Sequence, residues 1–418
     1  MKSYKNLKIT VVGLARSGMA AARLLKRSGA SVSITEKKNT PALEKLSTQL
    51  KTEGIGVELG AHSRSFIEGR DLIVISPGVR LDADPVKWAK GSNIEVISEI
   101  ELSFSLCPAP VIAITGTNGK TTTTTLVGEV IKACGKKVFV LGNIGTPFSS
   151  AVLSMRGDDL VSLEVSSFQL EAIKDFKPKI AVILNLTPDH LDRYRDVDEY
   201  LEAKKRIYMN QEKDDILILN YGDNALRKIA EEAKPKVEFF NKEEWEKDLD
   251  QNQMAVLAVA EALGIKRSVC AQVFKKFKGV EHRMEFVRDI GGIEFINDSK
   301  ATNIDSTIWA LTNIRKPAVL IAGGRDKGSD FASIRALVKD KVREAVLVGE
   351  ASERIAAAWD GVVPIYRVET FHEAVTAAYK RARPGEMVLF SPMCKSFDMF
   401  TDYEHRGRVF KELVNKFT

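Results

Sequence analysis

Residues 111–121 read VIAITGTNGKT, an apolar strand-like run that enters a glycine turn and then a helix beginning in threonines. Glycines let backbone N–H groups converge on an anion, a helix N-terminus favours negative charge, and lysine adds a mobile positive charge. The order strand, loop, helix therefore predicts a phosphate-binding loop, with Lys120 at the phosphates and the Thr121 hydroxyl where a Mg²⁺ ligand is needed. The full pattern is incomplete because Ile114 stands where its first glycine would fall. The alternative is a glycine-rich turn with a surface lysine, which the flanking strand and helix disfavour.

The rest of the chain alternates short β-branched runs with longer helical patterns, which predicts an α/β fold with largely parallel sheets. Its 418 residues are too many for one ordinary core and suggest about three domains. We expect a Rossmann-like domain over residues 1–98, a P-loop ATPase-like domain over 99–279 and a second Rossmann-like domain over 280–418. A helical connection over residues 99–106, followed by the breaker Cys107-Pro108-Ala109-Pro110, marks the first boundary.

The bulk composition predicts a cytoplasmic protein. Hydrophobic residues make up 44% and charged residues 28% of the chain, as in soluble globular proteins, and the longest apolar runs are strand-sized. The basic N-terminus lacks the apolar core of a secretory signal. The scattered cysteines argue against disulfide stapling or a zinc site; they are Cys107, Cys134, Cys270 and Cys394. The net charge of +6 is dispersed, which fits a solvated surface better than a nucleic-acid-binding one.

Two polar residues follow strand-like runs in the middle of the chain. Glu164 ends one run, and a carboxylate at that sheet edge is what a Mg²⁺ ion bridging ATP phosphates requires. A solvated strand-end glutamate is the alternative. His190 follows another run, and on the residues alone a loop histidine bonded to Asp189 or Asp192 is the preferred interpretation.

The first turn of the chain also resembles a nucleotide-binding motif. Gly13–Gly18 approximates a dinucleotide fingerprint, although Ala15 replaces the middle glycine, and Glu36 lies where a ribose-binding acid would fall. On its own this pattern supports a nicotinamide-dependent oxidoreductase as well as any other nucleotide-binding protein.

Six strings occur in one order along nearly the whole chain. They are TGTNGKT (115–121), LEVSSFQL (163–170), NLTPDHLD (185–192), NDSKATN (297–303), GGRDK (323–327) and SPMCKSFD (391–398). Together they resemble the Mur ligases of bacterial cell-wall synthesis, and the first string is similar to the ATP loop of folylpolyglutamate synthetases as well.

The resemblance implies an ATP-dependent carbon–nitrogen ligase in peptidoglycan precursor synthesis. It implies that the enzyme adds D-glutamate to UDP-N-acetylmuramoyl-L-alanine through an acyl phosphate, with ATP and Mg²⁺ as cofactors. The expected partners are these small molecules, and we expect a cytoplasmic monomer that neither binds nucleic acid nor inserts into membranes. The alternatives are another Mur ligase or a folylpolyglutamate synthetase, the nicotinamide-dependent oxidoreductase, and a non-catalytic nucleotide-binding or nucleic-acid-binding regulator. Residues 391–403 favour D-glutamate, and the chain has no Asp-Asn-Pro-Arg motif.

The resemblance also implies roles for individual residues. The catalytic residues are Lys120, Lys204, His190 and Asn143, and the metal-binding ones are Thr121, Glu164, His190 and a carbamylated Lys204. The nucleotide-binding residues are Gly116, Thr117, Asn118, Gly119, Lys120, Thr121, Thr122, Asn252, His282, Arg283 and Asp298. The UDP-sugar is expected at Arg16, Ser17, Glu36 and Ser76, and the amino acid at Lys300, Thr302, Lys327, Ser396 and Phe397.

Some of these positions depart from the family pattern or are open to another interpretation. On the residues alone, Lys204 looks like a helix-surface lysine beside two other cations. Asp248-Leu249 replaces the family's usual His-Asn pair before Asn252, which leaves the adenine contacts open. Lys395 stands where a small residue is expected, next to the amino-acid site. Residues 279–283 are expected to act as a hinge that closes the third domain.

Overall fold

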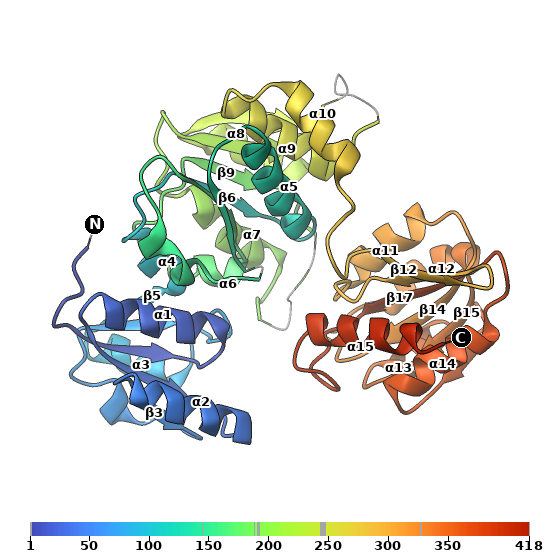
Figure 1. Ribbon diagram of the computed structural model, residues 1–418, viewed down its shortest axis with the longest axis horizontal. Helices are drawn as coiled ribbons and strands as arrows, with labels where there is room; N and C mark the ends of the chain where they lie inside the picture. Colours follow the sequence, from blue (N-terminus) through green and yellow to red (C-terminus); the bar gives the residue numbers. More distant parts are fainter. Residues whose placement is uncertain are drawn as a thin grey trace. The chain divides into compact units, whose positions relative to one another are not determined.

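The computed structural model describes residues 2–143, 145–187, 189, 193–242, 248–326 and 328–417. His190 and Lys327, for which the sequence predicts metal and amino-acid contacts, lie outside the described residues. The described helices and strands form three α/β sheets, as the alternation of the sequence predicts (Figure 1). Within the described ranges, no helix is both long enough and apolar enough to cross a membrane.

The first sheet is parallel throughout and has the strand order β3-β2-β1-β4-β5. Its elements are β1 (Lys8–Val12), α1 (Arg16–Arg27), β2 (Ser31–Glu36), α2 (Pro41–Thr52), β3 (Gly56–Leu59), β4 (Leu72–Ile75), α3 (Asp84–Gly91) and β5 (Glu95–Ser98). Strand β1 lies between β2 and β4, so the strand order reverses beside it. Sheets of this kind bind ligands at the carboxyl edge where the order reverses.

The second sheet is also parallel throughout, with the order β11-β10-β9-β6-β8-β7. Its strands are β6 (Val111–Thr115), β7 (Val138–Gly142), β8 (Leu160–Glu164), β9 (Ile180–Ile183), β10 (Ile216–Asn220) and β11 (Lys236–Phe240). The helices between β5 and β12 in the chain are α4 (Glu99–Phe104), α5 (Lys120–Ala133), α6 (Ser167–Leu170), α7 (Val197–Lys205), α8 (Asn224–Glu232), α9 (Gln251–Ala262) and α10 (Arg267–Lys276).

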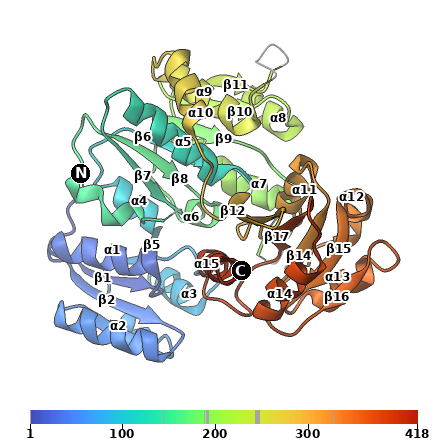
Figure 2. The same cartoon turned by 45° about the vertical axis from the view of Figure 1, so that its right-hand side comes forward.

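Strand β6 is buried on both faces, which explains its continuous apolar run. Ile112 and Ile114 pack in the core beneath α5 and α9, while Val111 and Ala113 belong to the core on the opposite face. Figures 1 and 2 show α5 and α9 side by side over this sheet. The central sheet is therefore covered on both faces, and the phosphate-binding loop follows β6 at the carboxyl edge of this sheet.

The third sheet has the order β12-β13-β17-β14-β15-β16. Its strands are β12 (Glu285–Ile290), β13 (Ile293–Asn297), β14 (Ala318–Gly323), β15 (Val342–Leu347), β16 (Ile365–Arg367) and β17 (Met387–Met393). Its helices are α11 (Ile304–Asn313), α12 (Arg335–Lys341), α13 (Ser352–Ala358), α14 (Phe371–Arg381) and α15 (Tyr403–Asn415). Strand β12 pairs with β13 in an antiparallel hairpin and all other neighbours are parallel, so the sheet is mixed.

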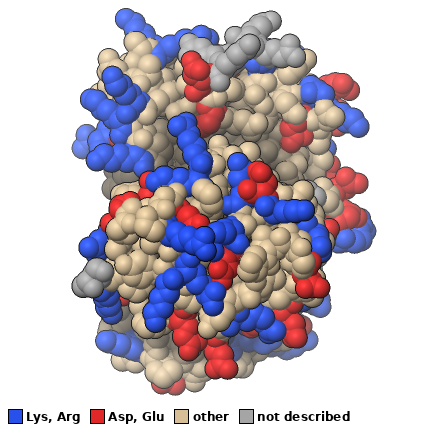
Figure 3. All heavy atoms as spheres, turned by 90° about the vertical axis from the view of Figure 1, so that its right-hand side faces the viewer, with Lys and Arg blue, Asp and Glu red and all other residues tan. Residues whose placement is uncertain are grey.

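Contacts divide the chain into two compact units. The first holds the chain up to Leu186 together with Asp198–Phe277, and the second holds Thr187–Val197 with the residues from Lys278 onward. The four cysteines are free thiols. On the face drawn in Figure 3, Lys and Arg side chains are interspersed with Asp and Glu, as on a solvated surface.

Candidate active site

The phosphate-binding loop lies where β6 passes into α5. Gly119 precedes the helix with φ 82°, and Gly116 has φ 149°, both in the region that favours glycine. A Cβ at Gly116 would lie 2.9 Å from Cβ of Leu184, and one at Gly119 would lie 2.2 Å from Oδ1 of Asn252. The backbone therefore approaches its neighbours more closely than any other residue would allow. This tight turn aims the N-terminus of α5 at the carboxyl edge of the sheet, as a phosphate site requires.

Lys120 folds back over this loop. Its Nζ donates to the carbonyl oxygens of Gly116 at 2.9 Å and Thr117 at 2.8 Å. The predicted phosphate-binding lysine thus lies over the loop itself. A surface lysine beside a plain glycine turn would not fold back in this way.

Three predicted residues from separate elements meet beside the loop. Glu164, at the end of β8, is only 2% exposed, and its carboxylate accepts hydrogen bonds from Oγ1 of Thr121 at 2.8 Å and Nδ2 of Asn143 at 2.9 Å. Asn143 also donates its backbone N–H to the carbonyl of Glu164 at 2.9 Å. A hydroxyl and a carboxylate are oxygen ligands that suit Mg²⁺, so Thr121 and Glu164 fit the ion. Glu164 is not a solvated strand-end residue.

Lys204 is buried, so the interpretation as a helix-surface lysine is wrong. Only 1% of it is exposed; its Nζ donates to the carbonyl of Gly116 at 2.8 Å and lies 4.5 Å from the ring centroid of Tyr200. The buried residues Tyr200, Ala203, Lys204 and Ile207 recur at helical spacing and form one inward face. That spacing was visible in the sequence and could have placed Lys204 inside.

The cations next to Lys204 in the sequence point elsewhere. Lys205 forms an ion pair with Glu202 at 2.8 Å, and the Arg206 guanidinium donates to the carbonyl of Leu170 at 2.7 Å. Lys204 alone among the three basic residues therefore reaches the phosphate-binding loop.

Asn252 stands beside the loop from the first turn of α9. Its Oδ1 accepts a hydrogen bond from Oγ1 of Thr123 at 3.3 Å and lies against Gly119. Helix α9 begins near the loop because Asp250 caps it in a reciprocal pair with Gln253. The helix thus starts earlier than its apolar run from Met254 indicated.

The turn predicted to hold UDP is built from β1, α1 and the loop after β4. The Glu36 carboxylate accepts the backbone N–H groups of Leu14 and Lys38, both at 2.9 Å. Ser76 is buried and its hydroxyl donates to the carbonyl of Gly13 at 3.1 Å, so it braces the turn. Arg16 is exposed at the start of α1.

Arg16 also borders a groove within the first unit. The groove has a volume of about 610 Å³ and runs along α1 beside residues 145–154. At its rim, Nη1 of Arg16 donates to the carbonyl of Gly145 at 3.4 Å. Ser17 is half-buried in the first turn of the same helix.

In the second unit, Asp298 is fully buried after β13. Its carboxylate accepts the Met284 N–H at 3.2 Å and the Ser391 hydroxyl at 2.9 Å, and Nη1 of Arg283 lies 3.8 Å away. Burial raises the pKa of Asp298 to about 6, against the lowering effect of Arg283.

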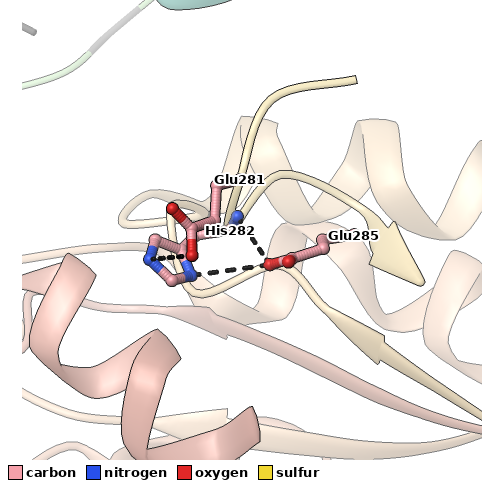
Figure 4. Close-up of side chains that lie close together, drawn as sticks. All are labelled: Glu281, His282 and Glu285. Atoms are coloured by element: carbon pink, nitrogen blue, oxygen red, sulfur yellow. Dashed lines mark hydrogen bonds and ion pairs between the residues drawn. The ribbon is translucent and has the colours of Figure 1, made fainter. Parts of the chain in front are cut away.

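His282 lies between two carboxylates but does not mark an open cation site (Figure 4). The ring is 3% exposed, with Glu281 at 3.8 Å and Glu285 at 3.6 Å, and the Asn297 amide lies 2.9 Å from Nδ1. The Lys411 ammonium bonds both carboxylates and already balances their charge. Burial lowers the pKa of His282 below its usual value.

These contacts bear on the expected hinge over residues 279–283. Residues 281–285 are tied to α15 through Lys411, and the carbonyl of His282 accepts the Lys300 N–H at 3.0 Å. Gly279 has φ 92°, and a Cβ there would meet nothing within 4 Å. Gly279, at the start of the expected segment, takes no part in these contacts.

The predicted amino-acid residues lie on the loops after β13 and β17. Lys300 reaches Tyr403, with Nζ 3.4 Å from the hydroxyl oxygen, and the Thr302 N–H donates to the Lys300 carbonyl at 2.9 Å. Ser396 is buried, whereas Phe397 is 57% exposed. The two loops therefore present a cation, a hydroxyl residue and an exposed ring at one sheet edge.

Sequence reasoning missed the side chain that joins these two loops. Arg406 of α15 is buried; its Nη2 donates to the carbonyls of Ser299 at 2.8 Å and Cys394 at 3.1 Å, and burial lowers its pKa to about 10. The unexpected Lys395 exchanges two backbone hydrogen bonds with Arg325, at 2.9 and 3.0 Å, which ties in the loop after β14. No local pattern marks an arginine in an amphipathic helix as buried.

Comparisons with known proteins agree with this arrangement. Residues 7–98 match the Mur ligase MurD-like N-terminal domain, 114–277 the Mur ligase middle domain, and 282–394 the Mur ligase glutamate ligase domain. Together these matches cover well over half of the chain.

Full-length relatives give the same family, and solved structures give the same fold. The UDP-N-acetylmuramoylalanine–D-glutamate ligase of Geotalea daltonii is 42% identical over 98% of this chain and 97% of its own length. The enzyme of that name from a Thermoanaerobacter species is 41% identical over 98% of both chains. The fold is similar to that of UDP-N-acetylmuramate–alanine ligase MurC from Thermotoga maritima, with a TM-score of 0.63, 19% identity and coverage of 98% and 99%. It is also similar to MurF from Acinetobacter baumannii, with a TM-score of 0.59, 16% identity and coverage of 99% and 92%. The full-length relatives and the three matched domains show that this chain belongs to the Mur ligase family.

Proposed function

We propose that this protein joins D-glutamate to UDP-N-acetylmuramoyl-L-alanine at the expense of ATP, as the names of its full-length relatives describe. The observation that carries the proposal is the meeting of Thr121, Asn143 and Glu164 beside the ATP loop. An oxidoreductase has no use for a phosphate loop flanked by a buried carboxylate. In support of a ligase, every group at this edge suits a phosphoryl transfer.

Mg²⁺ would be held by Thr121 and Glu164, whose oxygens lie together at the mouth of the loop. When bound, the ion supplies positive charge that neutralises the ATP phosphates. A second position is proposed for His190 and a carbamylated Lys204. The Lys204 amine lies at the carbonyl of Gly116, in the loop proposed to bind the phosphates.

The chemistry proceeds in two balanced steps. An oxygen of the L-alanyl carboxylate attacks the γ-phosphorus of ATP, the bond to the β-phosphate oxygen breaks, and ADP leaves. The D-glutamate amine then attacks the acyl carbon and loses a proton, and inorganic phosphate leaves with the former carboxylate oxygen. Lys120 stabilises the charge on the transferring phosphoryl group, and Asn143, whose amide is held by Glu164, is assigned to the γ-phosphate and the acyl group.

We assign the UDP-sugar substrate to the domain of residues 1–98, ATP to the domain of 99–279 and D-glutamate to the domain of 280–418. Arg16, Ser17, Glu36 and Ser76 are assigned to UDP, and Asn252, His282, Arg283 and Asp298 are assigned to the nucleotide. Lys300, Thr302, Lys327, Ser396 and Phe397 receive D-glutamate, whose two carboxylates require cations and hydrogen-bond donors. The enzyme acts in the cytoplasm as a monomer.

The proposal is tested by phosphate release with UDP-N-acetylmuramoyl-L-alanine, ATP and Mg²⁺ against a panel of D- and L-amino acids. D-Glutamate should give the highest kcat/KM, and each substrate should be required. Equal turnover with L-lysine or diaminopimelate would assign the protein to another branch of the family. Turnover with a reduced folate and L-glutamate would assign it to the folate polyglutamylases.

A further inference from the structure

The side chain of Asn185 continues the hydrogen bonding of the central sheet beyond the end of strands β6 and β9. Strands β6 and β9 pair in parallel up to Thr115 and Ile183, and the Leu184 N–H then donates to the Thr115 carbonyl at 3.0 Å. The Asn185 carbonyl accepts the N–H of Thr117 at 3.0 Å. The backbone of the ATP loop is thus still paired with the neighbouring chain after both strands have ended.

The next pair of hydrogen bonds is made by the Asn185 side chain. Its Oδ1 accepts the N–H of Asn118 at 2.8 Å, and its Nδ2 donates to the carbonyl of Asn118 at 3.1 Å. A primary amide offers one donor and one acceptor in a plane, as a peptide group does, so it can replace a strand residue in such a pair. The backbone N–H and the carbonyl of Asn118 are therefore both hydrogen-bonded to the side chain of Asn185.

We propose that Asn185 is a positioning residue of the ATP loop, which it holds in the phosphate-binding conformation through Asn118. The loop lacks the first glycine of the full phosphate-loop pattern, because Ile114 occupies that place inside β6. The loop is therefore held by a residue that lies outside it in the sequence, Asn185. Because the N–H groups of Thr117 and Asn118 donate to Asn185, phosphate oxygens bind the N–H groups nearer the start of α5.

The same residue begins the segment that leads toward the proposed metal ligand His190. Its neighbour Leu186 donates its N–H to Oδ2 of Asp223 at 2.9 Å, and Asp223 also caps α8 by accepting two N–H groups. The residue that follows Asn185 is thus anchored independently of the loop, through a half-buried hydrogen bond to the cap of α8. An anchor fixed in this way can resist displacement when the loop binds and releases phosphate.

The inference rests on the proposed use of ATP at this loop, so its test includes a readout that needs no nucleotide. Asn185→Ala removes both hydrogen bonds to Asn118, and amide exchange of the Asn118 N–H should become at least about tenfold faster. ADP binding, measured by calorimetry, should weaken about tenfold, since two amide hydrogen bonds no longer order the loop. The KM for D-glutamate should change less than about twofold.

Asn185→Asp serves as the second variant. Its carboxylate keeps an acceptor for the Asn118 N–H but places a second oxygen against the Asn118 carbonyl and adds negative charge near the phosphates. ADP binding should weaken more than in Asn185→Ala. The matched control is Asn210→Ala, which deletes an amide that donates to the carbonyls of Lys174 at 2.8 Å and Phe176 at 3.0 Å, near the amino ends of the strands. It should leave ADP affinity unchanged.

The outcomes separate this inference from the proposed function. Wild-type exchange of the Asn118 N–H in Asn185→Ala would overturn the anchoring role whatever the protein's substrates are. Faster exchange with unchanged ADP affinity in both Asn185 variants would also overturn it, because the anchor would then not serve nucleotide binding. A loss of ADP affinity in Asn210→Ala equal to that in Asn185→Ala would show a general effect of destabilisation and would likewise contradict it.

Discussion

The Glu164 carboxylate accepts a hydrogen bond from the Thr121 hydroxyl at 2.8 Å, although the two residues lie 43 positions apart in the chain. The contact exists because β8 is the immediate neighbour of β6, so the end of one strand faces the loop that follows the other. It places a buried acid and a hydroxyl side by side at the phosphate loop. This pair is where the account locates Mg²⁺.

Glu164→Gln should therefore raise the Mg²⁺ concentration needed for half-maximal phosphate release by at least about tenfold. The amide keeps a hydrogen bond to Thr121 but removes the negative charge that binds the cation. The control is Glu101→Gln, a buried carboxylate that accepts the N–H groups of Lys174, Asp175 and Phe176 away from the loop. An unchanged Mg²⁺ requirement in a folded Glu164→Gln protein would place the metal elsewhere.

Lys120→Ala should reduce phosphate release by at least about a hundredfold while the protein stays folded. The ammonium that lies over the loop carbonyls is the charge that stabilises the transferring phosphoryl group. Circular dichroism checks the fold, and Lys132→Ala, in the last turn of the same helix, is the matched control. Near-normal turnover in Lys120→Ala would remove this loop from catalysis.

Lys204→Ala should cause a severe loss of activity that acetate partly restores. CO₂ reacts with an amine in its neutral form, and the Lys204 amine is buried at the carbonyl of Gly116 in the phosphate-binding loop. The resulting carbamate supplies a carboxylate that a small free carboxylate can replace in the vacant space. Three extra atoms on Nζ in a crystal structure would show the modification directly.

Lys205→Ala is the control for this prediction, because Lys205 carries the same charge one position away but pairs with Glu202. It should retain most of its activity. An unmodified Lys204 together with an active Lys204→Ala enzyme would refute carbamylation.

The pH dependence of stability should report the burial of Asp298. Burial raises its pKa from 3.8 to about 6, so the folded state binds this proton more tightly than the unfolded state does. The stability from this group is greatest below pH 3.8 and is lost as pH rises through about 6. Asp298→Asn lacks the titration, so its unfolding free energy relative to wild type should rise by about 1.5 kcal/mol from pH 5 to pH 7.5. Urea unfolding at both pH values measures this, and parallel pH profiles for the two proteins would contradict it.

The parts of the molecule that the sequence predicts well are those that local patterns determine. The ATP loop needs a buried strand, a glycine turn and a helix start in succession, and residues 111–121 contain all three. The central strands carry unbroken apolar runs because both faces are covered. Edge strands are harder to predict, because one side stays partly exposed and the apolar run is short, as in β3, β5, β11, β12 and β16.

The site is less visible because it depends on contacts between distant segments. Glu164 and Thr121 could be proposed as metal ligands, but only the strand order brings them together. On the residues alone Lys204 looks like a surface lysine, because its charge outweighs the spacing of its buried neighbours. The metal role that the resemblance implies for it stays a prediction. Asn185 carried no chemical signal, since an asparagine after a strand is ordinary until the register shows what lies opposite it.

The most direct test of the account is one reaction containing UDP-N-acetylmuramoyl-L-alanine labelled with heavy oxygen in its terminal carboxylate, together with ATP, Mg²⁺ and D-glutamate. Mass spectrometry of both products follows the label and the peptide. The account predicts a UDP-sugar dipeptide that has gained one glutamate residue, and one heavy oxygen in each molecule of released phosphate. Unlabelled phosphate, or an unchanged UDP-sugar peptide in the presence of every substrate, would contradict it.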